Sequence, residues 1–130
     1  MTAGFSVTID PARDLVRIRL AGFFSPEDMA TFLAEFRAAY AGLRCGPNEH
    51  LTILDIRELA IQARDAVAGF AGLLADPRFH ARRLACVAAG TLARSQLNRA
   101  LAGRRDARVF ADPAEAESWI FAHSVEDQAA

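Results

Sequence analysis

The chain has 130 residues, of which 52% are hydrophobic and 24% are charged. This length fits one domain with a buried core, and the composition excludes an intrinsically disordered chain. The formal net charge is −1, which gives no general attraction to nucleic acid or anionic lipid. No apolar run has the length of a membrane span, and the first residues lack a signal-peptide pattern, so we expect a cytoplasmic protein without membrane insertion.

Two segments near the N-terminus alternate apolar and polar residues, which is typical of strands with one buried face. Phe5, Val7 and Ile9 alternate with serine and threonine, and the alternation resumes from Leu15 to Leu20 after a turn at residues 10–14. These strands are predicted to form a β-hairpin that lies toward the edge of the sheet or has one face in water.

A helix is predicted to begin at Ser25-Pro-Glu-Asp28. An N-cap serine, a proline in the first turn and an acid three positions on satisfy the free N–H groups of a helix start. Aromatic and aliphatic residues follow at helical spacing as far as the stop at Gly42 to Gly46. A stripe of this kind either packs on a sheet or lines a ligand cavity, and packing is far commoner.

Residues 50–56 are predicted to form the central strand of the sheet. Leu51 and Ile53 fall on one face while Leu54 and Ile56 fall on the other, so both faces must be covered. The side chains predicted to be nearly fully buried are Phe36, Ile53, Leu54 and Val87.

The rest of the chain alternates helices with strands. The remaining predicted elements are a helix from about Ala63 to Ala75, a strand from Leu84 to Ala89, a helix from Leu92 to Ala102 with Thr91 as its N-cap, a strand from Ala107 to Phe110, and a helix that begins at Asp112-Pro113. The order ββαβαβαβα predicts an α/β fold, an N-terminal β-hairpin followed by αβαβαβα with a mostly parallel sheet. We expect one domain over residues 1–130, with a polar, frayed tail from about residue 124.

The order and spacing of several motifs resemble the bacterial SpoIIAA-like proteins, which share the α/β architecture of STAS and Sec14 (CRAL-TRIO) domains. The motifs are the hairpin from Phe5 to Leu20, Gly22 before Ser25-Pro-Glu-Asp28, the strand end Leu54-Asp55-Ile56, the segment Leu84-Ala-Cys-Val-Ala-Ala-Gly90, and Phe110-Ala-Asp-Pro-Ala-Glu-Ala116 followed by Trp119. The resemblance covers about residues 5–122. It implies strands in nearly sequential order and a non-catalytic regulatory or protein-interaction module, with a Sec14-like carrier of a small apolar or lipid-like ligand as the alternative.

The resemblance does not extend to the phosphorylation switch of the anti-sigma antagonists in the STAS class. Those proteins carry the switch serine at a helix start soon after an Asp-Leu-Ser strand end. Here the strand ends in Asp55-Ile-Arg57, and no serine or threonine lies between Thr52 and Thr91. Asp65 would place a fixed negative charge near the missing serine, although the helix dipole already explains an acid at a helix start.

Candidate binding residues lie where the strands end, because ligand sites in open α/β sheets gather at the carboxyl ends of strands. A carboxylate there is more often structural, for example paired with a neighbouring arginine. A helix start after a tight turn also offers free N–H groups to an anion. The candidate ligand- or partner-binding residues are Asp55, Arg57, Asp65, Gly90, Thr91 and Arg94.

The sequence does not favour an enzyme. His50, His80 and His123 are scattered, with none at metal-ligand spacing from another or from a cysteine. The P-loop, the dinucleotide glycine fingerprint and Gly-x-Ser-x-Gly are absent, so no catalytic residue, metal or cofactor is expected. Cys86 lies within an apolar strand and is predicted to be inert packing, and Cys45 and Cys86 together suit a reducing compartment.

The expected partner is a protein or a second copy of this chain. An arginine-rich stretch from Arg94 to Arg108 has no interleaved aromatic residue, so it predicts a solvated face with partners in the acidic helix that follows, and not a nucleic-acid site. With strands in sequential order, right-handed crossovers place all helices on one face of the sheet. The other face of the two buried strands must then be covered by a crossing helix or by a second subunit, and a homodimer is the prediction.

Overall fold

The computed structural model describes residues 3–46, 48–60, 62, 68–70, 72–73 and 76–129. The described elements are β1 (Gly4–Asp10), β2 (Leu15–Gly22), α1 (Pro26–Tyr40), β3 (Leu51–Leu59), β4 (Arg83–Val87), α3 (Thr91–Ala100), β5 (Ala107–Phe110) and α4 (Pro113–Ala129). Residues 68–70 and 72–73 are helical and belong to the predicted second helix, whose other residues lie outside the described part.

The five strands form one sheet in the order β1-β2-β3-β4-β5, which confirms the predicted sequential order. β1 and β2 are antiparallel, and the remaining neighbours are parallel. The hairpin register runs without a shift from Gly4 opposite Ala21 to Asp10 opposite Leu15. Its turn ends at Asp14, whose φ of 54° lies in the left-handed region that aspartate tolerates better than most residues.

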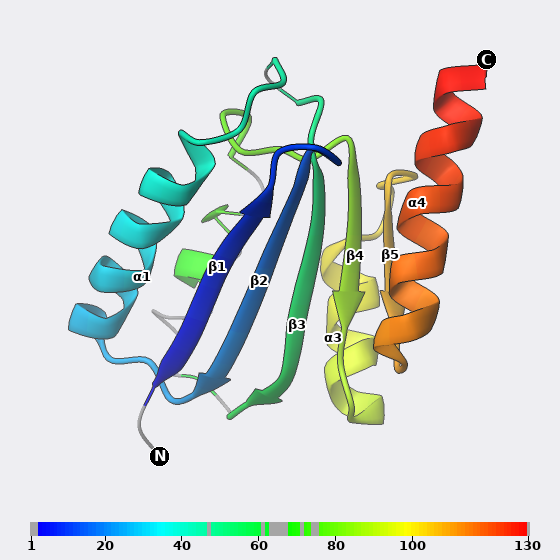
Figure 1. The fold of residues 1–130 in the computed structure, drawn as a ribbon. Helices are drawn as coiled ribbons and strands as arrows, with labels where there is room; N and C mark the ends of the chain where they lie inside the picture. The colour runs from blue at the N-terminus through cyan, green and yellow to red at the C-terminus, as the bar shows by residue number, and fades with distance from the viewer. Residues whose placement is uncertain are drawn as a thin grey trace.

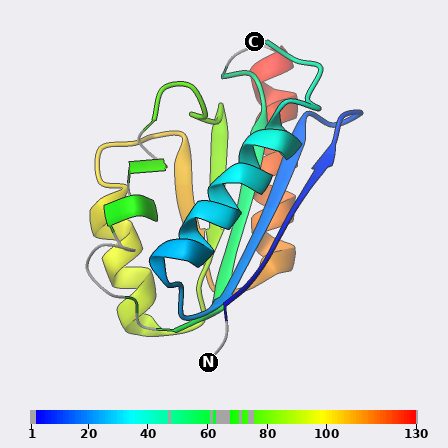
Figure 2. The ribbon, with the colours of Figure 1, turned by 90° about the vertical axis from the view of Figure 1, so that its left-hand side faces the viewer.

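Helices cover both faces of the sheet. Figure 2 shows α1 and α3 in front of the sheet and α4 behind it, and Figure 1 shows α1 and α4 on opposite sides. Ala116 and Ile120 of α4 are fully buried against Ile53, Ala85 and Val87. The expectation that all helices lie on one face is therefore wrong, and a crossing helix, the alternative to a second subunit, covers the other face of β3 and β4. α4 follows the last strand and returns to no further strand, so the crossover rule does not fix its side.

An aromatic cluster fills the core on the α1 face. Ring centroids lie 6.2 Å apart for Phe24 and Phe32, 6.1 Å for Phe32 and Phe36, and 5.4 Å for Phe24 and Phe70. The apolar stripe of α1 thus packs on the sheet. The four side chains predicted to be buried are at most 7% exposed, which confirms the central position of β3.

The helix starts follow the predicted capping in two cases out of three. Ser25 and Asp28 form a reciprocal capping box, and Asp112 Oδ1 accepts a hydrogen bond from the Ala114 N–H at 2.9 Å. Thr91 is not the N-cap of α3: Gly90 holds that position, and no side chain caps the helix. None of the described helices is both long and apolar enough to cross a membrane.

α4 continues to Ala129, through the residues from about 124 that are predicted from the sequence to form a polar tail. After Pro113 the segment contains neither glycine nor proline, so no residue interrupts the helical backbone.

Candidate functional site

Asp55 and Arg57 form an ion pair within β3. The Arg57 Nε and Nη2 atoms donate to Asp55 Oδ1 at 3.0 Å and to Oδ2 at 2.8 Å, and the Arg57 main-chain N–H adds a third hydrogen bond. The hydrogen bonds from Arg57 hold the pKa of Asp55 below its ordinary value. Asp55 is therefore a weak base at neutral pH and fits the structural pairing with a neighbouring arginine.

Gly90, Thr91 and Arg94 meet at the start of α3. The Arg94 Nη1 atom donates to the Ala89 carbonyl at 2.9 Å, so this guanidinium closes the connection from β4 into the helix. Asp55 lies on the sheet face that α4 covers, whereas α3 lies on the opposite face. Within the described residues no hydrogen bond or ion pair joins the two halves of the predicted site, and Asp65 lies outside those residues.

A groove of about 250 Å³ lies on the α4 face, between the hairpin and the first turns of α4. Of the residues proposed from the sequence that the structure describes, only Asp55 lines it. The lining residues are Ser6, Thr8, Arg17, Ile18, Arg19, Ile53, Asp55, Val87, Pro113 and Glu117.

The hairpin supplies the polar wall of the groove. Ser6 stands opposite Arg19 and Thr8 opposite Arg17 across the antiparallel pair, so two hydroxyls and two guanidiniums share one face. α4 packs chiefly on β3, β4 and β5, which leaves the hairpin face open beside it. The alternation in the sequence predicted this wet face; the groove arises because α4 borders it.

The charged groups of the groove are paired with carboxylates. Arg17 pairs with Glu117 of α4, and the Arg19 Nη2 atom lies 2.5 Å from Glu58 Oε2. All four side chains are between 43% and 61% exposed. Exposed ion pairs of this kind contribute about 1 kcal/mol or less to stability. A charged group of a binding partner can therefore replace one member of the pair at little cost in free energy.

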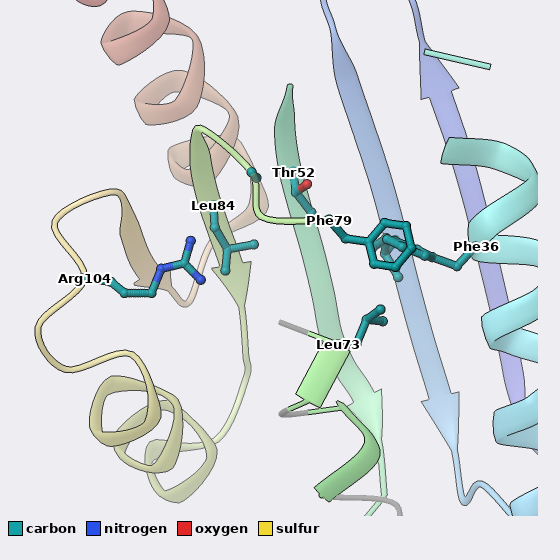
Figure 3. A pocket seen from close by; sticks show the side chains of 8 residues that line it. Phe36, Thr52, Leu73, Phe79, Leu84 and Arg104 are labelled. Carbon is teal, nitrogen blue, oxygen red and sulfur yellow. The ribbon is translucent and has the colours of Figure 1, made fainter. Parts of the chain in front are cut away.

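A second, much smaller cavity lies on the α1 face (Figure 3). It is lined in part by Phe36, Leu73 and Phe79, and its volume of about 30 Å³ has room for water but not for an apolar ligand.

His80, Arg104 and Asp106 form a polar cluster near this cavity, and sequence reasoning missed it. The His80 Nε2 and Asp106 Oδ2 atoms lie 2.9 Å apart, and Arg104 Nε donates to Asp106 Oδ1 at 3.0 Å. Burial acts to raise the pKa of Asp106, but hydrogen bonds from Arg104 and His80 outweigh it and lower that pKa. Arg94 and Arg104 therefore bond on the sheet face opposite α4, so α4 is not the partner of these two arginines.

The Cys86 thiol is fully buried, and burial raises its pKa to about 12. Cys45 is half-buried, and burial and the nearby Asp14 raise its pKa as well. We expect iodoacetamide to alkylate Cys86 at least about a hundredfold more slowly in the folded protein than in urea, because the thiolate is the reactive form. Mass spectrometry of tryptic peptides reads the two sites separately, and rapid labelling of Cys86 in the native protein would contradict inert packing.

Among the described histidine, cysteine, aspartate and glutamate residues, no group of three or more is placed to hold a metal ion.

No protein-family model matches the sequence, and no curated protein matches it. Among solved structures, the fold is similar to the crystal structure of an uncharacterised protein from Shewanella loihica PV-4, described as a DUF3478 family member with a SpoIIAA-like fold. The TM-score is 0.75, the similarity covers 92% of this chain and 96% of the other, and the sequences are 20% identical. The chain therefore has the SpoIIAA-like fold that its motifs implied, and at this identity the likeness concerns the fold alone.

Proposed function

We propose that the chain is a non-catalytic regulatory or protein-interaction module of the cytoplasm, and that it holds its partner in the groove between the hairpin and α4. The proposal rests on the residues that line this groove. Its floor includes the apolar Ile53 and Val87, and its rim presents hydroxyls and both signs of charge. A polypeptide matches this mixture, because its side chains supply apolar groups, carboxylates and cations within a short length.

The pairing of the rim charges supports an interaction role. Arg17 and Arg19 each hold a carboxylate that is itself roughly half exposed. A partner carboxylate can replace Glu117 or Glu58 without leaving a buried charge unpaired, so binding avoids the large desolvation cost of an uncompensated ion.

The carrier alternative finds less support. A carrier of an apolar or lipid-like ligand needs an apolar cavity of several hundred Å³. The cavity beside Phe36 and Phe79 measures about 30 Å³, and the groove that is large enough has a charged rim.

The enzyme alternative also finds little support among the described residues. Asp55 is bound by Arg57, and Cys86 is buried with a raised pKa. Neither group has the environment of a general base or a nucleophile at neutral pH.

Affinity capture from the protein's own host tests the proposal. Wild type is compared with Arg19→Ala, which removes a groove guanidinium, and with Arg105→Ala, which removes an exposed arginine outside the groove. We expect a discrete protein to be retained by wild type and by Arg105→Ala, and its recovery to fall about tenfold with Arg19→Ala, as for the loss of one charge-assisted contact.

Native mass spectrometry of the same samples distinguishes the alternatives. A small molecule that stays bound to wild type would favour the carrier. Equal recovery of every protein with Arg19→Ala and Arg105→Ala would contradict the groove as the partner site.

A further inference from the structure

We infer that the free edge of β1 pairs with the β1 edge of a second copy of this chain, which joins two five-stranded sheets into one around a two-fold axis. This surface differs from the sheet face that α4 covers, and the inference does not depend on the function proposed above. It rests on the character of the strand, its residual exposure and its self-complementarity.

The two edges of the sheet differ in how they are protected. β5, the last strand in the order, has four residues and carries Arg108. β1 has seven residues, no proline, no bulge against β2, and no charge before Asp10. Figure 2 shows β1 at the outer edge, with no described strand beyond it. Proteins commonly prevent an edge strand from pairing with another chain by making it short or by placing a charge, a proline or a bulge in it. β1 has none of these features before Asp10.

The apolar side chains of β1 are not fully covered within one chain. Phe5, Val7 and Ile9 pack against the core on the α1 face, yet all three are only half-buried. A strand placed against the outer edge would remove part of their remaining surface from water.

The main-chain groups of the same three residues face the open edge. The Leu51 N–H donates to the Asp14 carbonyl, so that carbonyl points toward β3. Because successive residues of a strand point their N–H and C=O groups to alternate sides, Arg17 and Arg19 direct theirs toward β1. The main-chain N–H and C=O groups of their partners, Thr8 and Ser6, point toward β2. Those of Phe5, Val7 and Ile9 therefore point away from β2, toward the open edge.

A two-fold axis at Val7 matches like with like. Antiparallel pairing about this residue sets Val7 against Val7 of the second copy, Phe5 against Ile9, and Ser6 against Thr8. Apolar side chains then meet on the α1 face and hydroxyls meet on the α4 face. An isologous interface requires this self-complementarity.

The pairing would also extend the groove. Ser6 and Thr8 line it, and the two-fold axis keeps the α4 faces of both sheets on the same side. Ser6 and Thr8 of the second copy would therefore lie beside the first copy's hydroxyls, so that each groove continues onto its neighbour.

Sedimentation of wild type and of a Ser6→Glu, Thr8→Glu double variant tests the inference. Both positions are exposed and stand opposite Arg19 and Arg17 in the same chain, so the new carboxylates are compatible with the monomer fold. Across the two-fold axis they face each other as two like-charged pairs. We expect wild type to reach twice the 14.1 kDa chain mass at roughly 100 µM and the variant to dissociate about tenfold more readily.

A Ser6→Glu, Thr8→Lys variant is the matched control. It introduces the same number of charges but sets opposite signs against each other across the axis. The new lysine stands opposite Arg17 within its own chain, which offsets part of this gain, so the variant should dimerise about as well as wild type. Hydrogen exchange of wild type gives a second measurement that needs no variant. The amides of Phe5, Val7 and Ile9 should exchange more slowly at high concentration, while those of Ser6 and Thr8 should not change.

A wild-type mass of one chain at every concentration would overturn the inference. So would a double glutamate variant that dimerises as well as wild type, since another surface would then form the dimer. Amide protection of Phe5, Val7 and Ile9 that is independent of concentration would overturn it as well.

Discussion

Replacing Phe24 by alanine is expected to lower the free energy of unfolding by about 3–5 kcal/mol. Phe24 follows β2 and is 1% exposed. Its ring lies 6.2 Å from Phe5, 6.2 Å from Phe32 and 5.4 Å from Phe70, measured between centroids. Truncation removes the apolar contacts and leaves a cavity that several rigid rings cannot close, and urea unfolding followed by circular dichroism measures the loss.

The neighbouring phenylalanine is the matched control. Phe23 is 42% exposed, so Phe23→Ala should change the free energy of unfolding by no more than about 0.5 kcal/mol. The two substitutions remove the same atoms one residue apart, and only burial differs. Equal losses at the two positions would contradict the placement of the aromatic core.

The sequence predicted the sheet well because the strands carry local signals. Alternation in the hairpin identified a wet face, and the apolar run at 50–56 identified a strand covered on both sides. Both signals arise because the spacing of apolar side chains along a short segment shows which of its faces are buried. The side taken by α4 leaves no such signal, because Ala116 and Ile120 would be apolar on either face.

The groove was less predictable than the fold because its lining residues come from five separate elements, β1, β2, β3, β4 and α4. Arg17 and Glu117 are 100 residues apart in sequence, and they meet only once α4 has crossed to the far face. Asp55 was proposed because ligand sites in α/β sheets gather at strand ends, but β3 continues to Leu59, so Asp55 lies within the strand and not at its end. Ser6 and Thr8 were interpreted only as the wet side of a strand, and nothing local marks them as part of a site.

His50 was also interpreted too simply, as one of three scattered histidines. It is 1% exposed and directly precedes β3. Its Nδ1 atom lies 3.0 Å from the Tyr40 hydroxyl oxygen, and the ring is hydrogen-bonded to the main chain of Phe79. Burial disfavours the charged imidazolium and lowers the pKa of His50 from 6.5 to about 4, although the hydrogen bond with Phe79 acts in the opposite direction.

This lowered pKa makes the free energy of unfolding depend on pH. Above about pH 6.5 the imidazole is neutral in both states, so the full stability is present. As the pH falls from 6.5 toward 4, the unfolded chain takes up a proton that the folded chain excludes, and stability is lost. The loss is about 3 kcal/mol across the whole range and about 2 kcal/mol between pH 7 and pH 5.

Urea unfolding of wild type and His50→Gln at about pH 7 and about pH 5 isolates this contribution. Glutamine has no titrating group, so His50→Gln is expected to lose about 2 kcal/mol less than wild type over this interval, even though it starts from a lower stability at pH 7. Carboxylates titrate mainly below pH 5 and contribute equally to both proteins. An equal loss of unfolding free energy in the two proteins would mean that folding does not lower the pKa of His50. The ring would then be protonated in the folded state at about pH 5, in contact with water.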